Sequence, residues 1–423
     1  MASSSPVRLS AWRFVVTFGF VSLLSDFVYE GARSITGPLL AHLGATALIV
    51  GIVTGVGEAA ALTLRLVSGP LADRTKRFWA WVIAGYALTV VSVPTLGLTG
   101  TLWVASALVI AERVGKAVRS PAKDALLSYA TFGTGRGRGF AVQEALDQIG
   151  AIIGPLVVAG MLVLTGGEYG PSLGILAIPG VAALALLVWL RARVPDPIAY
   201  EPAGAQASEP AQPDGSAGPP APASSPAPPA SPAPAASRRT RLPRAFWAYS
   251  GFTALTMVGF ATFGVLSFHM VAHGIITAEL VPVLYAGVMA VDAGVALATG
   301  WAYDRFGSRV LLLLPVIAAL IPVFAFTDAV GTVIAGALLW GAALGIQEST
   351  LRATVADLID PSRRSTAYGI YAAVVGVATA IGGIIAGALY GVSIPLLIIV
   401  TLIVQAVAIV SFALLFLRRR SAA

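Results

Sequence analysis

Three ionisable residues lie inside an apolar stretch near the start of the chain, SLLSDFVYEGARS at residues 22–34. Asp26, Glu30 and Arg33 are spaced i, i+4 and i+7, which places them on one face of an α-helix. Each charge costs about 2.5–3.5 kcal/mol at the centre of a membrane-spanning helix. The stripe therefore predicts a water-filled cavity with partner charges, in which carboxylates bind protons or a solute. The alternative is an internal ion pair that fixes this helix to its neighbours.

Further ionisable residues lie within apolar segments, where each carries a similar cost. They are Glu58, Glu112, Arg113, Lys116, Asp292, Glu348 and Arg352. Glu112 with Lys116, and Glu348 with Arg352, are spaced i, i+4 and predict ion pairs on helix surfaces. An adjacent arginine favours an ionised carboxylate, whereas a low-dielectric cavity favours the protonated form. With the stripe at residues 22–34, these residues are our candidates for binding substrate and coupling its movement to protons.

The composition excludes an ordinary soluble protein. Of 423 residues, 57% are hydrophobic and 11% charged, whereas soluble proteins average about 25% charged residues. The net charge of +7 comes mostly from Lys and Arg at the ends of apolar runs, which favours membrane lipid over nucleic acid as a partner. The absence of cysteine excludes disulfides and thiolate metal sites. Motifs for nucleotide hydrolysis, zinc proteolysis and serine catalysis are also absent, so we expect neither an enzyme nor a cofactor.

Twelve apolar segments are each long enough to cross a bilayer, which takes about 20 residues. The first six are 12–40, 46–68, 79–99, 101–121, 139–165 and 171–191. The second six are 245–271, 281–302, 308–327, 330–355, 365–390 and 393–417. We therefore predict an all-α membrane protein with twelve transmembrane helices in two six-helix bundles. The bundles are residues 1–193 and 244–423, and the Pro/Ala-rich linker between them, 194–243, cannot bury a core.

Basic residues mark one side of the predicted membrane protein. The connections after every second apolar segment carry sequences such as DRTKR and DRFGSR, and both termini are basic as well. The opposite connections contain neither Lys nor Arg. Because Lys and Arg are enriched on the cytoplasmic side, we expect cytoplasmic termini and a cytoplasmic linker. We expect a multi-pass protein of the plasma membrane, in bacteria the inner membrane.

A short motif recurs at the same place in the two bundles. GPLADRTKRFW at 69–79 and GWAYDRFGSRV at 300–310 each follow the second apolar segment of a bundle. The shared positions are Gly69, Asp73, Arg74 and Arg77 in one copy and Gly300, Asp304, Arg305 and Arg309 in the other. The motif resembles the signature loop of the major facilitator superfamily, although Lys76 stands where that family usually has glycine. The resemblance covers nearly the whole chain and implies transport by alternating access.

The charges of this motif predict a conformational role. An acid at a helix end can pair with arginine or accept backbone N–H groups. Such contacts on the cytoplasmic side would hold the two halves in an outward-open state, with Arg119 as a candidate partner for Asp73. Ordinary helix-end capping is the alternative interpretation of the motif.

A second resemblance lies in DQIGAIIGPLVVAG at residues 147–160. Gly150, Gly154 and Pro155 match part of a pattern found in proton-coupled drug antiporters, although Val158 and Ala159 replace its closing glycine pair. The match favours export and adds Gly154 and Pro155 to the expected gating residues. Close packing of small residues between helices explains the same glycines equally well.

Two histidines near the end of the seventh apolar segment, His269 and His273, are spaced i, i+4. That spacing can hold a metal ion. No matching acidic or cysteine ligand lies nearby in sequence. We therefore expect a pore-lining or interfacial pair and no metal site.

These features predict a secondary active transporter that moves a small organic solute by alternating access, coupled to protons and directed outward. A proton-coupled importer and a uniporter are alternatives within transport. From another class, a lipid-handling protein or a receptor on the same scaffold is also open. A receptor would need a folded cytoplasmic domain, which a Pro/Ala-rich linker does not provide. We expect a monomer.

Overall fold

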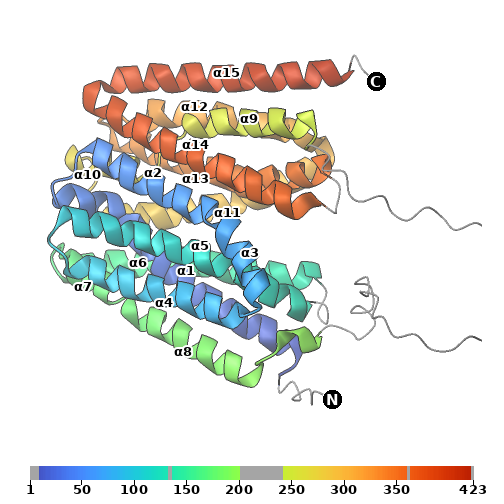
Figure 1. The fold of residues 1–423 in the computed structure, drawn as a ribbon. Coiled ribbons are helices and arrows are strands. Elements are labelled where there is room, and N and C mark those ends of the chain that lie inside the picture. Colours follow the sequence, from blue (N-terminus) through green and yellow to red (C-terminus); the bar gives the residue numbers. More distant parts are fainter. Residues whose placement is uncertain (1–8, 132–135, 201–241, 360–362, 421–423) are drawn as a thin grey trace, which may run out of the picture.

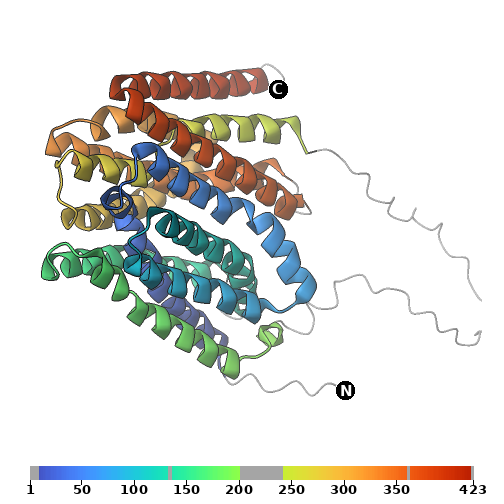
Figure 2. The ribbon, with the colours of Figure 1, turned by 60° about the vertical axis from the view of Figure 1, so that its left-hand side comes forward.

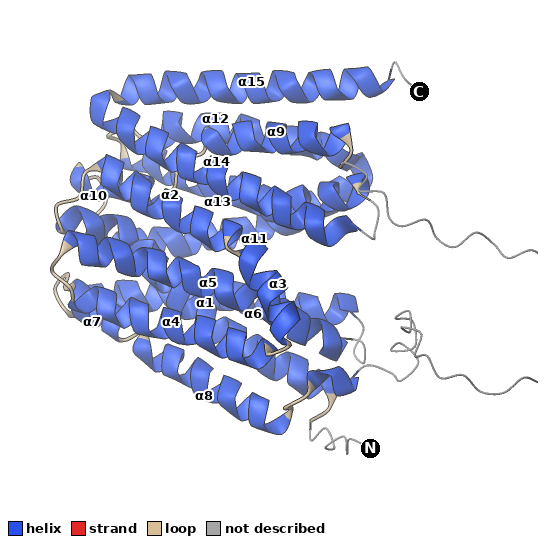
Figure 3. Ribbon diagram, viewed as in Figure 1, coloured by secondary structure: helices blue, strands red, loops and turns tan. Residues whose placement is uncertain are grey.

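The computed structural model describes residues 9–131, 136–200, 242–359 and 363–420. Most of the predicted linker, residues 201–241, lies outside this description. In the described ranges every regular element is helical and no strand occurs (Figure 3). We call residues 9–200 the first half and residues 242–420 the second half.

The first half consists of eight α-helices and a short 3₁₀ turn. They are α1 (Ala11–His42), α2 (Ala47–Thr63), α3 (Arg65–Thr75), α4 (Phe78–Leu98), α5 (Leu102–Thr131), α6 (Arg136–Leu164), α7 (Tyr169–Gly174), α8 (Ala177–Arg193) and η1 (Pro197–Tyr200). The predicted span 46–68 covers α2 and the start of α3, and the predicted span 171–191 covers parts of α7 and α8. The hydroxyl of Tyr200 donates to the carbonyl of Leu9 at 2.9 Å. Burial raises the pKa of Tyr200 to about 12, which keeps this hydroxyl protonated and able to donate.

The second half repeats this order with different breaks. Its helices are α9 (Arg244–Val258), α10 (Phe263–Ala272), α11 (Leu280–Phe306), η3 (Gly307–Leu312), α12 (Leu313–Ala325), α13 (Val330–Leu358), α14 (Arg364–Val392) and α15 (Ile394–Arg420). The predicted seventh span is broken into α9 and α10, with residues 259–262 unwound between them. Broken helices of this kind are common beside the substrate sites of transporters.

Within the described residues, ten helical stretches have the length and hydropathy that a membrane span needs. One of them, Leu280–Ala325, is 46 residues long and contains two predicted spans, since about 20 residues cross a bilayer. The charges within α5, including Glu112, Arg113 and Lys116, keep that helix out of the ten. With α5 included and the long stretch divided, the structure contains the twelve spans that the sequence predicts.

The two halves lie side by side, with the helices of each running in similar directions (Figures 1 and 2). The beginning of α1 and the end of α15 lie at the same end of the molecule, here called the terminal end. The opposite end, where α1 ends and α2 begins, is called the distal end. Basic residues of the described connections, among them Lys76, Arg77, Arg193 and Arg309, belong to the terminal end.

The seam between the halves is formed largely by α2 and α14, which lie against each other in both views (Figures 1 and 2). Small residues allow the backbones to touch: a Cβ atom on Gly51 would overlap the carbonyl oxygen of Gly383. Gly387 meets the backbone of Ala47 in the same way one turn nearer the distal end. Further contacts cross between the halves, and the most extensive of them are α6 with α11 and α1 with α10.

Candidate functional site

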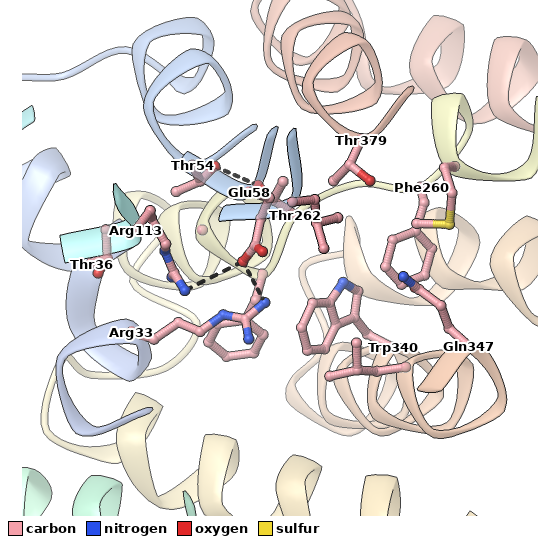
Figure 4. A pocket seen from close by; sticks show the side chains of 15 residues that line it. Arg33, Thr36, Thr54, Glu58, Arg113, Phe260, Thr262, Trp340, Gln347 and Thr379 are labelled. Atoms are coloured by element: carbon pink, nitrogen blue, oxygen red, sulfur yellow. Dashed lines mark hydrogen bonds and ion pairs between the residues drawn. The ribbon is translucent and has the colours of Figure 1, made fainter. Parts of the chain in front are cut away.

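A cavity lies between the two halves, beside the distal half of α1 and the middle of α2 (Figure 4). Its volume of about 70 Å³ holds a few water molecules, at roughly 10–15 Å³ each. The first half lines it with Arg33, Thr36, Thr54, Glu58, Leu62 and Arg113. The second half lines it with Met257, Phe260, Thr262, Phe263, Gly264, Trp340, Leu344, Gln347 and Thr379. Among the described residues, all the charges of the lining therefore come from one half.

Glu58 is the centre of the charged wall. Its Oε1 atom lies 3.0 Å from Nη2 of Arg33 on α1 and 3.5 Å from Nη1 of Arg113 on α5, as Figure 4 shows. Gly57 makes this possible, because a side chain there would press on Arg113. Partner charges therefore lie beside Arg33, as the charged stripe at residues 22–34 predicts.

Glu30 links this cluster to the other half. Its carboxylate lies 3.6 Å from Nη1 of Arg33 and accepts a hydrogen bond of 2.6 Å from the hydroxyl of Tyr285 on α11. Glu30 and Tyr285 are both buried. The bond therefore joins the halves without exposure to bulk solvent.

The basic residues of α5 pack against an aromatic ring. The Tyr29 ring centroid lies 4.4 Å from the guanidinium carbon of Arg113 and 3.8 Å from Nζ of Lys116, which are cation–π distances. The predicted pair of Glu112 with Lys116 is wrong. Glu112 instead lies 3.4 Å from Nε of Arg113, because the side chain of Lys116 is turned toward α1.

Asp26 is separate from the Glu58 cluster, although it shares a helix face with Glu30 and Arg33. It is half-buried and forms no ion pair or hydrogen bond with a described residue. Its charged neighbours include Asp147 and Lys123, which lie 3.3 Å apart. The stripe on α1 therefore belongs to two polar clusters. Glu30 and Arg33 lie in the cluster at the cavity, and Asp26 lies in a second cluster nearer the terminal end.

Asp292 on α11 is 2% exposed and accepts a 3.5 Å hydrogen bond from Gln148 on α6 of the other half. Its second oxygen, Oδ1, is buried and has no hydrogen-bond partner in the described ranges. Glu348 on α13 is exposed. The side chain of Arg352 lies outside the described residues, so its pair with Glu348 stays a prediction.

The repeated motif occupies the terminal ends of α3 and α11. Gly69 and Gly300 lie within the helices, and the charged side chains of both copies are exposed; these are Asp73, Arg74, Arg77, Asp304, Arg305 and Arg309. Both helices end at a residue with positive φ, Lys76 with φ of 52° in the left-handed helical conformation and Gly307 with φ of 64°. Lys76 therefore adopts the turn for which the family usually has glycine.

The expected pairing of Asp73 with Arg119 is wrong for this structure. Arg119 is buried and donates from Nη1 to Oγ1 of Thr89 at 2.9 Å. Its guanidinium carbon lies 4.8 Å from the ring centroid of Tyr86. These partners are on α4, which packs closely on α5 through Gly85 and Gly115. The close approach turns Arg119 into the first half, away from the exposed Asp73.

The glycines of the fifth span form a packing face. A Cβ on Gly154 would overlap the carbonyl oxygen of Phe27, and one on Gly150 that of Leu23. The buried Pro155 follows on the same helix, α6. This geometry agrees with the small-residue packing interpretation, and a gating role for Gly154 and Pro155 stays a prediction.

The two histidines lie at the distal end, with ring centroids 4.5 Å apart. Both ring nitrogens of His269 are engaged: Nδ1 lies 2.8 Å from the Tyr390 hydroxyl and Nε2 lies 3.2 Å from the Thr327 carbonyl. His273 is exposed, 4.0 Å from Asp328. Among the described residues no group of three or more metal-ligand side chains occurs.

Sequence reasoning missed several residues of the site. Tyr29, Tyr285 and Trp340 contact its charged side chains, and the Trp340 ring centroid is 5.5 Å from the Arg33 guanidinium carbon. Thr54 and Thr262 hydrogen-bond across the halves at 2.7 Å. In an apolar run such residues resemble ordinary membrane-facing or packing positions. One of them could have been found from the sequence: Tyr29 directly precedes Glu30 and lies on the same helical turn.

Comparison with known proteins agrees with this architecture. Residues 18–295 and 276–423 match the model of the Major Facilitator Superfamily. An uncharacterized protein of Mycobacterium tuberculosis is 60% identical over 402 residues, which cover 95% of this chain and 92% of that protein. An uncharacterized MFS-type transporter of Methanocaldococcus jannaschii is 31% identical over 141 residues, or 33% of this chain and 35% of that relative.

A solved structure shows the same fold at low sequence identity. It is a POT family transporter in complex with a thioalcohol-conjugated peptide, which superposes with a TM-score of 0.73 at 12% identity. The match covers 97% of this chain and 96% of that one. At this identity the likeness concerns the fold alone.

Proposed function

The chain belongs to the Major Facilitator Superfamily, and from that premise we propose that it is a proton-coupled secondary transporter of a small organic solute. It moves the solute by alternating access of the cavity between its two halves. The observation that carries the proposal is Glu58 held between Arg33 and Arg113 on the cavity wall. A purely structural ion pair would not need to border a cavity at the seam between two bundles.

Glu58 is the residue we assign to proton coupling. Its carboxylate contacts arginines from two different helices, α1 and α5. A nearby arginine favours the ionised carboxylate, and separation from it in a low-dielectric cavity favours proton uptake. Any step of the transport cycle that separates Glu58 from Arg33 or Arg113 would therefore couple substrate movement to proton uptake. Glu30 is less suited to this role, because the hydroxyl of Tyr285 already donates to it.

The direction of transport is part of the proposal. The match of the fifth span to drug antiporters favours export, whereas the packing of Gly154 on Phe27 supplies a structural reason for the same residues. Export predicts that an inward proton gradient drives solute out of the compartment that faces the terminal end. Uptake predicts movement of proton and solute in the same direction.

The orientation and assembly are also proposed. Basic connections gather at the terminal end, and the described distal connections, such as 43–46 and 273–279, contain neither Lys nor Arg. By the positive-inside rule the terminal end faces the cytoplasm. We propose a monomer in the plasma membrane, since one chain forms the complete cavity.

A flux measurement tests the function. The purified full chain is reconstituted into liposomes that contain a pH-sensitive dye, and solutes of different classes are added under an imposed pH gradient of either sign. At least one class should drive proton movement in the wild type and in Glu168→Gln, whose exposed carboxylate is remote from the cavity. Glu58→Gln should abolish coupled proton movement. Unchanged proton flux in Glu58→Gln contradicts the assignment of that residue.

A further inference from the structure

Positively charged groups of the protein gather at the cavity, and they indicate the charge of the solute that it binds. Its lining contains two arginines and one glutamate, and among the described residues no charged side chain of the second half lines it. Arg113 is 4% exposed, and its Nε and Nη1 atoms have no hydrogen-bond partner among the described residues. These donors lie within ion-pair distance of glutamates but without hydrogen-bond geometry. A buried guanidinium with unsatisfied donors favours an additional anionic acceptor.

The start of α10 adds a second positive feature at the same cavity. Thr262, Phe263 and Gly264, which begin this helix, all line the cavity. The hydroxyl of Thr262 bonds to Thr54 of the other half, and it does not cap its own helix. The first N–H groups of an α-helix have no intrahelical acceptor and carry partial positive charge. This uncapped helix start therefore also favours an anion.

The opposite wall is suited to an apolar body. Met257, Phe260, Trp340 and Leu344 all line the cavity from the second half. The Arg33 guanidinium carbon lies 5.5 Å from the Trp340 ring centroid, so the charged and apolar walls meet at this pair (Figure 4). A solute with one charged group and an apolar or aromatic body can contact both walls at once.

We propose that the substrate is an amphipathic organic monoanion, such as an aromatic carboxylate, and that it binds together with a proton on Glu58, which selects uptake of proton and solute in the same direction over export. The inference rests on the proposed transport function and specifies its substrate class. The substrate carboxylate occupies Arg33 and Arg113 in place of the Glu58 carboxylate. Glu58 takes up one proton as it loses the two arginines, so the charge of the cluster stays constant.

The electrostatic setting of Glu58 includes groups from every element around the cluster. They are Arg33 and Glu30 on α1, Arg113, Glu112 and Lys116 on α5, Tyr285 on α11 and Glu348 on α13. The surrounding acids Glu30, Glu112 and Glu348 do not line the cavity, whereas Glu58 does. Glu58 is also the acid that contacts both cavity arginines. An incoming carboxylate therefore competes with Glu58 more directly than with the other acids.

The test uses three probes with one carbon skeleton: 3-phenylpropionate, 3-phenylpropanamide and 3-phenylpropylamine. Their binding to the purified full chain is measured by equilibrium dialysis between pH 6 and pH 8. We expect the acid to bind at least tenfold more tightly than the amide and the amine. Its affinity should increase toward low pH, by up to about tenfold per pH unit for one linked proton.

Variants separate this proposal from a general effect of pH. Glu58→Gln should bind the acid at pH 8 as tightly as the wild type binds at pH 6, with no remaining pH dependence. Arg113→Gln should weaken the acid at least tenfold and leave the amide unchanged, and Glu168→Gln should behave as the wild type. The proposal is overturned if the amide or amine binds as well as the acid, or if Glu58→Gln keeps the wild-type pH slope.

The binding measurements on the wild type between pH 6 and pH 8 test the proposal even if a variant fails to fold. Proton flux driven by a solute of another class, without preferential binding of the acid, would refute this inference and leave the proposed transport function intact. Preferential binding of the acid without flux of any tested solute would refute the transport function alone.

Discussion

The hydroxyl of Tyr285 donates a 2.6 Å hydrogen bond to the carboxylate of Glu30, and the two residues belong to different halves of the protein. Alternating access requires the halves to move relative to each other. A buried hydrogen bond to a carboxylate contributes about 1.5–3 kcal/mol, so its presence in one conformation and loss in another would bias that equilibrium. The bond is therefore a conformational contact as well as part of the charged cluster.

Tyr285→Phe removes this contact while keeping the ring. We expect conformations that open the cavity to become about tenfold more populated, because one charged hydrogen bond no longer opposes separation of the halves. The chain contains no cysteine, so a single cysteine placed at Thr36 in the cavity wall reports the change through its maleimide labelling rate.

The matched control for Tyr285→Phe is Tyr249→Phe. Tyr249 is also buried, and its hydroxyl bonds to the Leu351 carbonyl within the second half. This variant should lower stability without changing the labelling rate. Equal acceleration of labelling by both variants would contradict a specific role for the bond between the halves.

The packing of α6 on α1 gives a second prediction. A Cβ on Gly154 would overlap the Phe27 carbonyl oxygen, whereas a Cβ on Gly160 of the same helix would meet nothing within 4 Å. Gly154→Ala should therefore destabilise the protein by about 1–3 kcal/mol through overpacking, and Gly160→Ala should be neutral or slightly stabilising. Thermal unfolding in detergent measures both. A similar Tm for the two variants would show that α6 shifts to accept the methyl group.

The left-handed residue at the end of α3 gives a third prediction. Lys76 has φ of 52°, a conformation that costs a non-glycine residue roughly 1–2 kcal/mol. Part of the gain on replacing it is offset by the greater freedom of glycine in the unfolded chain. Lys76→Gly should therefore stabilise by about 0.5–1 kcal/mol. The reciprocal change at the other copy, Gly307→Ala, should destabilise, and a rise in Tm for that variant would contradict the comparison.

The sequence predicts the spans of this fold well because the bilayer imposes a long apolar run on each one. It does not predict the breaks in these spans. The break between α9 and α10 follows from tertiary contacts, such as the hydrogen bond of 2.9 Å from Trp340 Nε1 to the unwound Ala261 carbonyl. The partner of such a carbonyl lies 79 residues away in the chain, beyond the reach of a local pattern.

The sequence predicts which residues of the candidate site are buried charges but not how all of them pair, for a similar reason. Helical spacing placed Glu30 and Arg33 on one face, and their cost in lipid correctly indicated that partner charges lie nearby. The same spacing failed for Glu112 with Lys116, because i, i+4 proximity contributes only about 0.2–0.5 kcal/mol. That is less than the cation–π contact of Lys116 with Tyr29 across two helices offers in a desolvated site. Spacing therefore identifies which charges are buried, and tertiary packing decides how they pair.

The burial of Asp292 leads to the last prediction. Its carboxylate has one long hydrogen bond, 3.5 Å from Gln148, and its Oδ1 atom is buried without a hydrogen-bond partner among the described residues. A buried carboxylate with so few partners is costly, whereas an asparagine of the same shape can form an amide pair with Gln148. Asp292→Asn should therefore raise stability by about 1 kcal/mol or more, measured as an increase in Tm.

Asp304→Asn is the control for this change, since Asp304 is exposed at the end of the same helix and its replacement should shift stability by less than about 0.5 kcal/mol. If Asp292 is kept for coupling and not for folding, Asp292→Asn combines higher stability with slower proton-driven flux. Lower stability of Asp292→Asn would mean that the carboxylate contributes to packing of the halves, and it would remove Asp292 from the coupling candidates.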